Sequence, residues 1–160
     1  MSKYNPVYNT IWTSNKFIKL TLKEKFIFLY LLTNERITQT GIYTIAPKHI
    51  ACDTEINLQE VDSILETLEA NKLIKFWHED NLIFIIDNFK FARNTIRNAL
   101  ILTKTIEAQK NLHKNEELWQ LFEDKYHAEL EVINQALMNQ QSNKNNSLHN
   151  NHNKIYEGGV

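Results

Sequence analysis

The residues whose chemistry most suggests a ligand are cations, and they occur in two short runs. They are Lys16, Lys19, Lys23 and Lys25 near the N-terminus, and Lys90, Arg93 and Arg97 near the middle of the chain. Ammonium and guanidinium groups bind phosphate oxygens, and rows of them are typical of surfaces that contact a nucleic-acid backbone. If both runs lie on one side of the molecule, they predict a phosphate-binding strip that needs no base-reading helix.

Polar side chains that would read bases lie on and around the segment from Asn57 to Asn71. In a helix-turn-helix the second helix enters the major groove, and its outward side chains contact base edges. The candidates for such contacts are Lys48, Asn57, Gln59 and Ser63, with Lys75 near the hairpin that follows. However, residues 53–72 contain six acids and one base. Each carboxylate near a phosphate costs about 1 kcal/mol even in water, so this docking mode is disfavoured.

The sequence offers no set of residues suited to catalysis or metal binding. It contains no glycine-rich loop that would cradle a phosphate, and its histidines are scattered singly or lie in a polar tail. Cys52 is the only cysteine and lies in an apolar helical pattern, which predicts a small core residue rather than a nucleophile. We therefore expect a protein that is not an enzyme, with no catalytic residues, no metal site and no cofactor.

Composition sets the limits of the fold and of the location. With 160 residues, 42% of them apolar, the chain can bury one core. A net charge of -1 gives no global attraction to nucleic acid, so binding would depend on local patches. The chain has no signal-peptide pattern and no apolar stretch long enough to span a membrane, which predicts a cytoplasmic protein without a membrane partner.

The elements that must position these residues form a winged helix-turn-helix. Residues 21–34 predict a central helix that starts with a capping box. Residues 47–71 predict a helix-turn-helix with Pro47 in its first turn, Asn57 as the N-cap of the second helix and Asn71 in the left-handed conformation at its end. Residues 73–77 and 82–86 predict a hairpin, which residues 41–45 extend to three strands. Before them, residues 1–20 predict an ordered arm whose Trp12 and Phe17 pack on the core rather than stack on bases.

The C-terminal part predicts helices with one apolar row. This row, here called the seam, has side chains spaced by three or four residues: Trp119, Phe122, Tyr126, Leu130, Ile133 and Leu137. It either closes a helical hairpin within the chain or joins two chains in an oligomer. We expect an arm at 1–20, a winged helix at 21–90, a helical hairpin or dimerisation helices at 91–138 and a disordered polar tail at 139–160.

Residues 10 to 92 also resemble a known family. The matching residues are Trp12, KFIFLYLLTN at 25–34, TGIY at 40–43, Leu65, Leu68 and Glu69 with Leu73 and Ile74, and Asn88 with Phe89. This pattern resembles the N-terminal winged helix of phage replisome organisers and DnaD-like replication initiation proteins. The resemblance implies a DNA-binding or oligomerising module of replication initiation, with a replicative helicase or helicase loader as a possible partner.

The sequence thus predicts a mainly α protein with a small three-stranded sheet, a winged helix-turn-helix followed by C-terminal helices. The function expected is non-enzymatic DNA binding by a homo-oligomer in phage or plasmid-type replication initiation. Two alternatives stay open, a winged helix used as a platform for protein-protein contacts and a transcriptional regulator, because one fold serves all of these roles.

Overall fold

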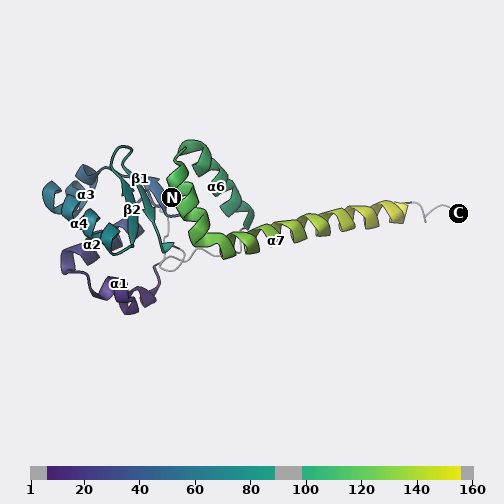
Figure 1. Cartoon of the computed structure of the whole chain (residues 1–160). Helices are drawn as coiled ribbons and strands as arrows, with labels where there is room; N and C mark the ends of the chain where they lie inside the picture. Colours follow the sequence, from purple (N-terminus) through teal and green to yellow (C-terminus); the bar gives the residue numbers. More distant parts are fainter. Residues whose placement is uncertain (1–6, 89–98, 156–160) are drawn as a thin grey trace. The chain divides into compact units, whose positions relative to one another are not determined.

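The computed structural model describes residues 7–88 and 99–155, with side chains described for 7–88 and 101–139. The chain forms two compact units (Figure 1). The first comprises Met1–Thr95 with Asn111–His113, and the second comprises Ile96–Lys110 with Lys114–Val160. The predicted arm and winged helix both fall in the first unit, which is helix-rich with a small sheet.

The first unit begins with two short helices that precede its central helix. They are the 3-10 helix η1 at Asn9–Thr13 and α1 at Asn15–Ile18. The central helix α2 spans Leu22–Thr33, and its N-cap Thr21 forms the predicted capping box with Glu24. Each of these two residues satisfies a backbone N–H of the other, which fixes where the helix starts. Helix α2 buries Ile27, Phe28, Leu31 and Leu32 in the core.

The helix-turn-helix follows the predicted plan. Helix α3 spans Pro47–Thr54 with its proline in the first turn, where a backbone N–H would have no helical partner. Glu55 then adopts a left-handed conformation, and α4 spans Leu58–Ala70. The side chain of Asn57 accepts a hydrogen bond of 2.9 Å from the N–H of Glu60, as predicted for an N-cap.

Three antiparallel strands complete the first unit in the spatial order β1-β3-β2. They are β1 at Ile42–Thr44, β2 at Ile74–Trp77 and β3 at Leu82–Ile85. All four β3 side chains are buried, as expected for a strand that is apolar on both faces. Ile83 and Ile85 belong to the main core cluster.

Three local predictions for this unit are wrong. Asn71 was expected in the left-handed conformation, but it has φ -81° and Lys72 takes that conformation with φ 54°. The side chain of Asn71 donates to the carbonyl of Thr67 at 2.9 Å, and the left-handed turn that closes the helix falls one residue later, at Lys72. Cys52 is exposed, since it lies on the outer side of α3. Trp12 is 59% exposed, whereas Phe17 is fully buried as predicted.

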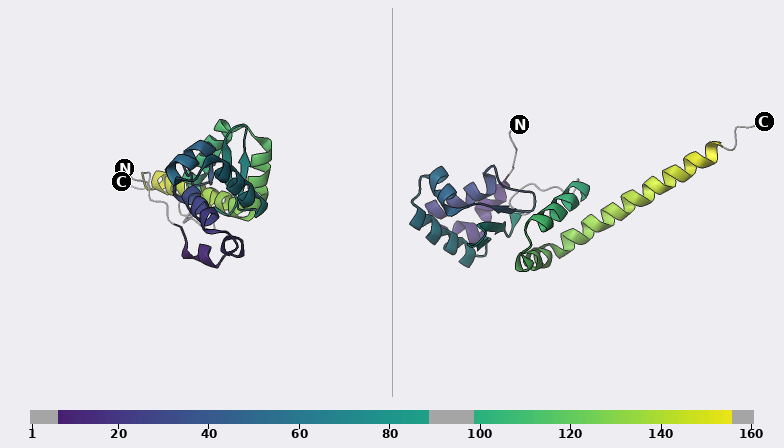
Figure 2. Two further views of the ribbon diagram at one scale, coloured as in Figure 1. Left: turned by 90° about the vertical axis from the view of Figure 1, so that its left-hand side faces the viewer. Right: turned by 90° about the horizontal axis from the view of Figure 1, so that it is seen from above.

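The second unit is built from two helices. Helix α6 spans Ala99–Leu112, and α7 spans Glu116–Ile155 with a kink at Tyr126. The first turns of α7 lie beside α6 (Figures 1 and 2). The rest of α7 extends past α6, and no other element of the second unit lies beside it. The helix thus continues into residues 139–155, for which disorder was predicted, because no proline or glycine interrupts the sequence between 116 and 157.

Because of Tyr43, we expect the first unit to lose stability at alkaline pH. Its hydroxyl donates to the carbonyl of Leu31 at 2.7 Å, and burial raises its pKa above the ordinary value of 10.0. The folded state therefore disfavours the phenolate, so this stabilisation is fully present below pH 10 and is lost as pH rises further. Urea unfolding between pH 8 and 11 should show stability falling above about pH 10, by up to roughly 1.4 kcal/mol per pH unit.

Tyr43→Phe is the matched control because it keeps the ring and removes the ionisable group. Above pH 10 the free energy of unfolding of this variant should fall less steeply than that of the native protein. Some decline remains because the pKa of Tyr30 is also raised, by burial and by its hydrogen bond to Asp53. Parallel declines in the two proteins would contradict this account.

Candidate nucleic-acid interface

Charge is partitioned within the first unit. Residues 7–33, which form η1, α1 and α2, contain four lysines and one glutamate. Residues 47–87, which form the helix-turn-helix, β2 and β3, contain three lysines and nine acids. A phosphate would therefore meet mainly positive charge at the N-terminal elements and mainly negative charge at the helix that would ordinarily read bases.

Trp12, Phe17 and Lys25 form one connected group on the N-terminal elements. The Trp12 and Phe17 rings meet edge to face, with centroids 5.2 Å apart. The ammonium of Lys25 lies 5.9 Å from the centroid of the same Phe17 ring. Because Phe17 is fully buried, it fixes an exposed indole and a cation on neighbouring helices.

Two further lysines of the predicted strip lie on α1 around Phe17. Lys16 donates to the carbonyl of Lys72 at 2.9 Å and to Oδ2 of Asp87 at 3.1 Å. Lys16 thus ties α1 to the two ends of the β2–β3 hairpin. Lys19 is the exposed C-cap of α1. We define the α1 face as Lys16, Lys19 and Lys25.

Three of the predicted DNA-binding residues on or beside α4 have partners within the protein. Both carboxylate oxygens of Glu60 bind Lys23, at 2.7 and 2.8 Å, and this pair joins the starts of α2 and α4. Lys75 lies 3.4 Å from the carboxylate of Glu69. The amide oxygen of Asn57 serves the cap of α4. These contacts leave less charge and fewer polar groups for a ligand than the sequence predicts.

The structure therefore divides the predicted DNA-binding residues into groups. Lys16, Lys23, Lys75 and Asn57 hold the fold together, whereas Lys19, Lys48, Gln59 and Ser63 are exposed. Lys48 lies on α3, and Gln59 and Ser63 lie on α4, away from the lysines of α1 in the sequence. Lys90, Arg93 and Arg97 fall outside the described residues, so the second half of the predicted strip has no described position.

The seam of the second unit packs largely within the chain. Trp119, Phe122, Tyr126 and Ile133 are buried, and Leu130 and Leu137 are half-buried. Lys110 on α6 binds Glu123 on α7 at 2.6 Å and lies 5.5 Å from the Trp119 ring. These contacts favour the intramolecular hairpin over pairing of two chains through the same side chains.

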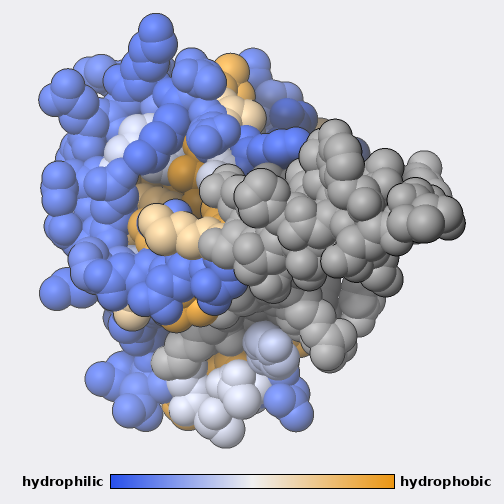
Figure 3. Space-filling model, turned by 90° about the vertical axis from the view of Figure 1, so that its right-hand side faces the viewer, coloured by the Kyte–Doolittle hydropathy of each residue, from blue (hydrophilic) through white to orange (hydrophobic). Residues whose placement is uncertain are grey.

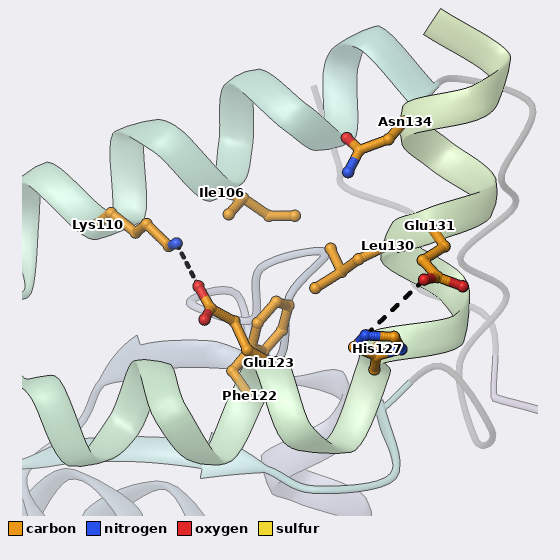
Figure 4. Close-up of a pocket in the computed structure, with 8 residues that line it drawn as sticks. All are labelled: Ile106, Lys110, Phe122, Glu123, His127, Leu130, Glu131 and Asn134. Atoms are coloured by element: carbon orange, nitrogen blue, oxygen red, sulfur yellow. Dashed lines mark hydrogen bonds and ion pairs between the residues drawn. The ribbon is translucent and has the colours of Figure 1, made fainter.

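A cavity of about 360 Å³ lies between α6 and α7 (Figure 4). Ile106, Phe122 and Leu130 form its apolar part, and its other lining residues are Lys110, Glu123, His127, Glu131 and Asn134. His127 and Glu131 are exposed and 3.8 Å apart. The lining includes no serine, threonine or cysteine, and its charged groups pair with one another.

Other kinds of site receive no support in the described part of the chain. No cluster of three or more metal-ligating side chains occurs among these residues. None of the described helices combines the length and the hydropathy needed to cross a bilayer. Where the face in Figure 3 is coloured, it is mainly hydrophilic, and hydrophobic residues show only in small areas among hydrophilic ones.

Sequence reasoning missed Trp12 as an exposed residue. It occurs in a segment with neither helical nor strand period, so no pattern indicates which way the indole points. A useful signal was the interleaving of aromatic residues and lysines from Tyr8 to Phe26.

Comparisons with protein-family models, curated proteins and solved structures find no match for this chain. The resemblance to replisome organisers therefore stays a prediction that rests on the residues quoted above.

Proposed function

We propose that this protein binds DNA without catalysing a reaction and that the α1 face of its winged-helix unit contacts the phosphates. The observation that carries the proposal is the separation of charge in that unit, with lysines on α1, at its C-cap and on α2, and acids on α3, α4 and the hairpin. A duplex presents closely spaced phosphates, so it binds where cations are dense and acids are few.

Two lysines of this face have ammonium groups that are not bound to a described carboxylate. Lys19 is exposed at the end of α1, and Lys25 lies over Phe17. Lys16 already binds Asp87, so its main contribution is to hold α1 in place. Two such cations alone would give only a shallow salt dependence, because the slope scales with the number of phosphates contacted. Lys90, Arg93 and Arg97 are proposed to add further phosphate contacts.

The proposed biological role is replication initiation. The support is the resemblance of residues 10 to 92 to replisome organisers, which also leads us to propose self-association, cytoplasmic location and a helicase or helicase loader as partner. The seam is mostly buried in the single chain, so self-association is proposed to use other surfaces, for instance the end of α7.

The test is a titration of duplex DNA at several salt concentrations with two variants of equal charge change. Lys19→Gln with Lys25→Gln removes two positive charges from the α1 face, and Gln59→Glu with Ser63→Glu adds two negative charges to α4. The first pair should weaken binding about tenfold and reduce the salt slope by about two. The second pair should change affinity much less.

Two outcomes would contradict the proposal. Equal losses in both variants would indicate only an effect of net charge, and a loss confined to the α4 pair would place DNA on the helix whose acids disfavour it. Both variants change exposed or half-exposed side chains, so circular dichroism should match the native protein.

A second candidate function is a platform for protein-protein contacts. It is favoured by the acids of residues 47–87 and by Leu58, which is 47% exposed at the start of α4. A native protein that binds neither duplex nor single-stranded DNA at low salt would favour this alternative over DNA binding.

A further inference from the structure

The exposed aromatic side chains of the first unit are concentrated on its basic elements. Among the described residues 7–88 and 101–139, the large exposed aromatic side chains are Tyr8, Trp12 and Phe26, which are 42%, 59% and 49% exposed. All three lie within the segment that carries the lysines of the α1 face. Burying such rings in the core would be favourable, so their exposure costs stability that a ligand can restore.

Trp12 is the best placed of the three. Its indole rests against the buried Phe17 ring at an angle of 87°, which restricts its motion while more than half of its surface stays open. Phe17 also lies under the Lys25 ammonium. A fixed indole next to lysines provides what an unpaired nucleotide needs, a flat apolar surface for the base and cations for its phosphates.

We propose that this surface binds single-stranded DNA by stacking an unpaired base on Trp12, with Lys19 and Lys25 contacting the adjacent phosphates. This inference rests on the proposed function and adds the class of nucleic acid. In a duplex the base faces are stacked on one another and are not available to Trp12, whereas every base of a single strand exposes one.

The charge of the surface decides between this ligand and a protein partner. Residues 7–33 contain four lysines and one glutamate, and the side chain of that glutamate is bound to the backbone N–H of Thr21 at 2.7 Å. An apolar protein surface would gain nothing from these lysines, whereas a polyanion with aromatic bases uses both features.

The test compares affinities for a 20-nucleotide oligothymidine and for a duplex of the same length. Trp12→Ala should weaken single-strand binding about tenfold more than duplex binding, because stacking on an aromatic side chain contributes about 1–3 kcal/mol per base. Trp12→Phe keeps an aromatic ring and should retain most of the single-strand affinity. Because Trp12 is largely exposed, both variants should fold.

A second readout follows the indole itself. In a Trp77→Phe, Trp119→Phe background Trp12 is the remaining tryptophan, and stacking of thymine should quench its fluorescence as oligothymidine is added. Saturable quenching with the same affinity as the binding curve would support the stacking.

The failures of the two proposals are distinguishable. If the native protein binds neither form of DNA, the proposed function itself fails. The native protein could instead bind DNA with a steep salt dependence, while Trp12→Ala lowers the affinity equally for single strand and duplex or for neither. In that case only the stacking inference is overturned. Light scattering could also show that Trp12→Ala changes the oligomeric state while the affinity for single-stranded DNA is unchanged. This result would identify the surface as a protein interface and would likewise overturn the inference.

Discussion

Replacing Phe17 by alanine is expected to lower the free energy of unfolding by about 4 kcal/mol. The side chain is fully buried, and its ring meets those of Trp12 and Phe28 with centroids 5.2 and 6.0 Å away. Removing a buried phenyl group loses its transfer free energy and leaves a cavity, which together cost about 3–5 kcal/mol. Urea unfolding followed by circular dichroism would measure the loss.

Phe17→Leu serves as the control for this prediction. Leucine fills most of the space, so the expected cost is about 1–2 kcal/mol. The leucine variant should nevertheless weaken single-strand binding, because it removes the ring that orients Trp12 and lies under Lys25. A loss below about 1 kcal/mol in Phe17→Ala would contradict the view that this ring anchors the N-terminal helices.

Gly41→Ala is expected to cost about 2–4 kcal/mol. Gly41 has φ 75°, a conformation that side chains with a Cβ rarely adopt, and an added Cβ would lie 2.7 Å from Cβ of Asn88. The positive φ costs about 1 kcal/mol and the overpacking a further 1–3 kcal/mol. Asn88 is buried and its amide donates to the carbonyl of Gln39 at 2.9 Å, so it cannot move away without losing this contact.

Chemical denaturation of Gly41→Ala beside Thr44→Ala would measure this effect. Thr44 lies exposed at the end of β1, the strand that follows Gly41, and alanine there should cost about 1 kcal/mol or less. Similar losses in the two variants would show that the close approach of Gly41 to Asn88 is not a constraint on the fold.

Much of the winged helix follows from local patterns in the sequence. The capping box at Thr21 and Glu24, the cap at Asn57 and the first-turn proline of α3 each indicate where a helix begins, and the structure confirms all three. The strands follow from runs of β-branched and aromatic residues, which pair in the register Ile74↔Ile85 and Trp77↔Leu82. These features depend on neighbours in the sequence, which is why sequence reasoning finds them.

The candidate site was harder to predict because it depends on distant partners. A lysine next to an apolar helix gives no sign that it will bind Asp87 or Glu60, residues far away in the sequence. Similarly, only the packing of η1 and α1 on α2 decides that Phe17 turns inward while Trp12 stays exposed. The sequence therefore predicted the sign of the charge on the α1 face better than the role of each lysine.

The most direct measurement maps the contact itself, by following backbone amide chemical shifts of the isotope-labelled protein while oligothymidine is added. The account predicts that the shifts concentrate in residues 8–26, around Trp12, Lys19 and Lys25. Shifts concentrated instead in residues 57–67 of α4, with residues 8–26 unaffected, would contradict it.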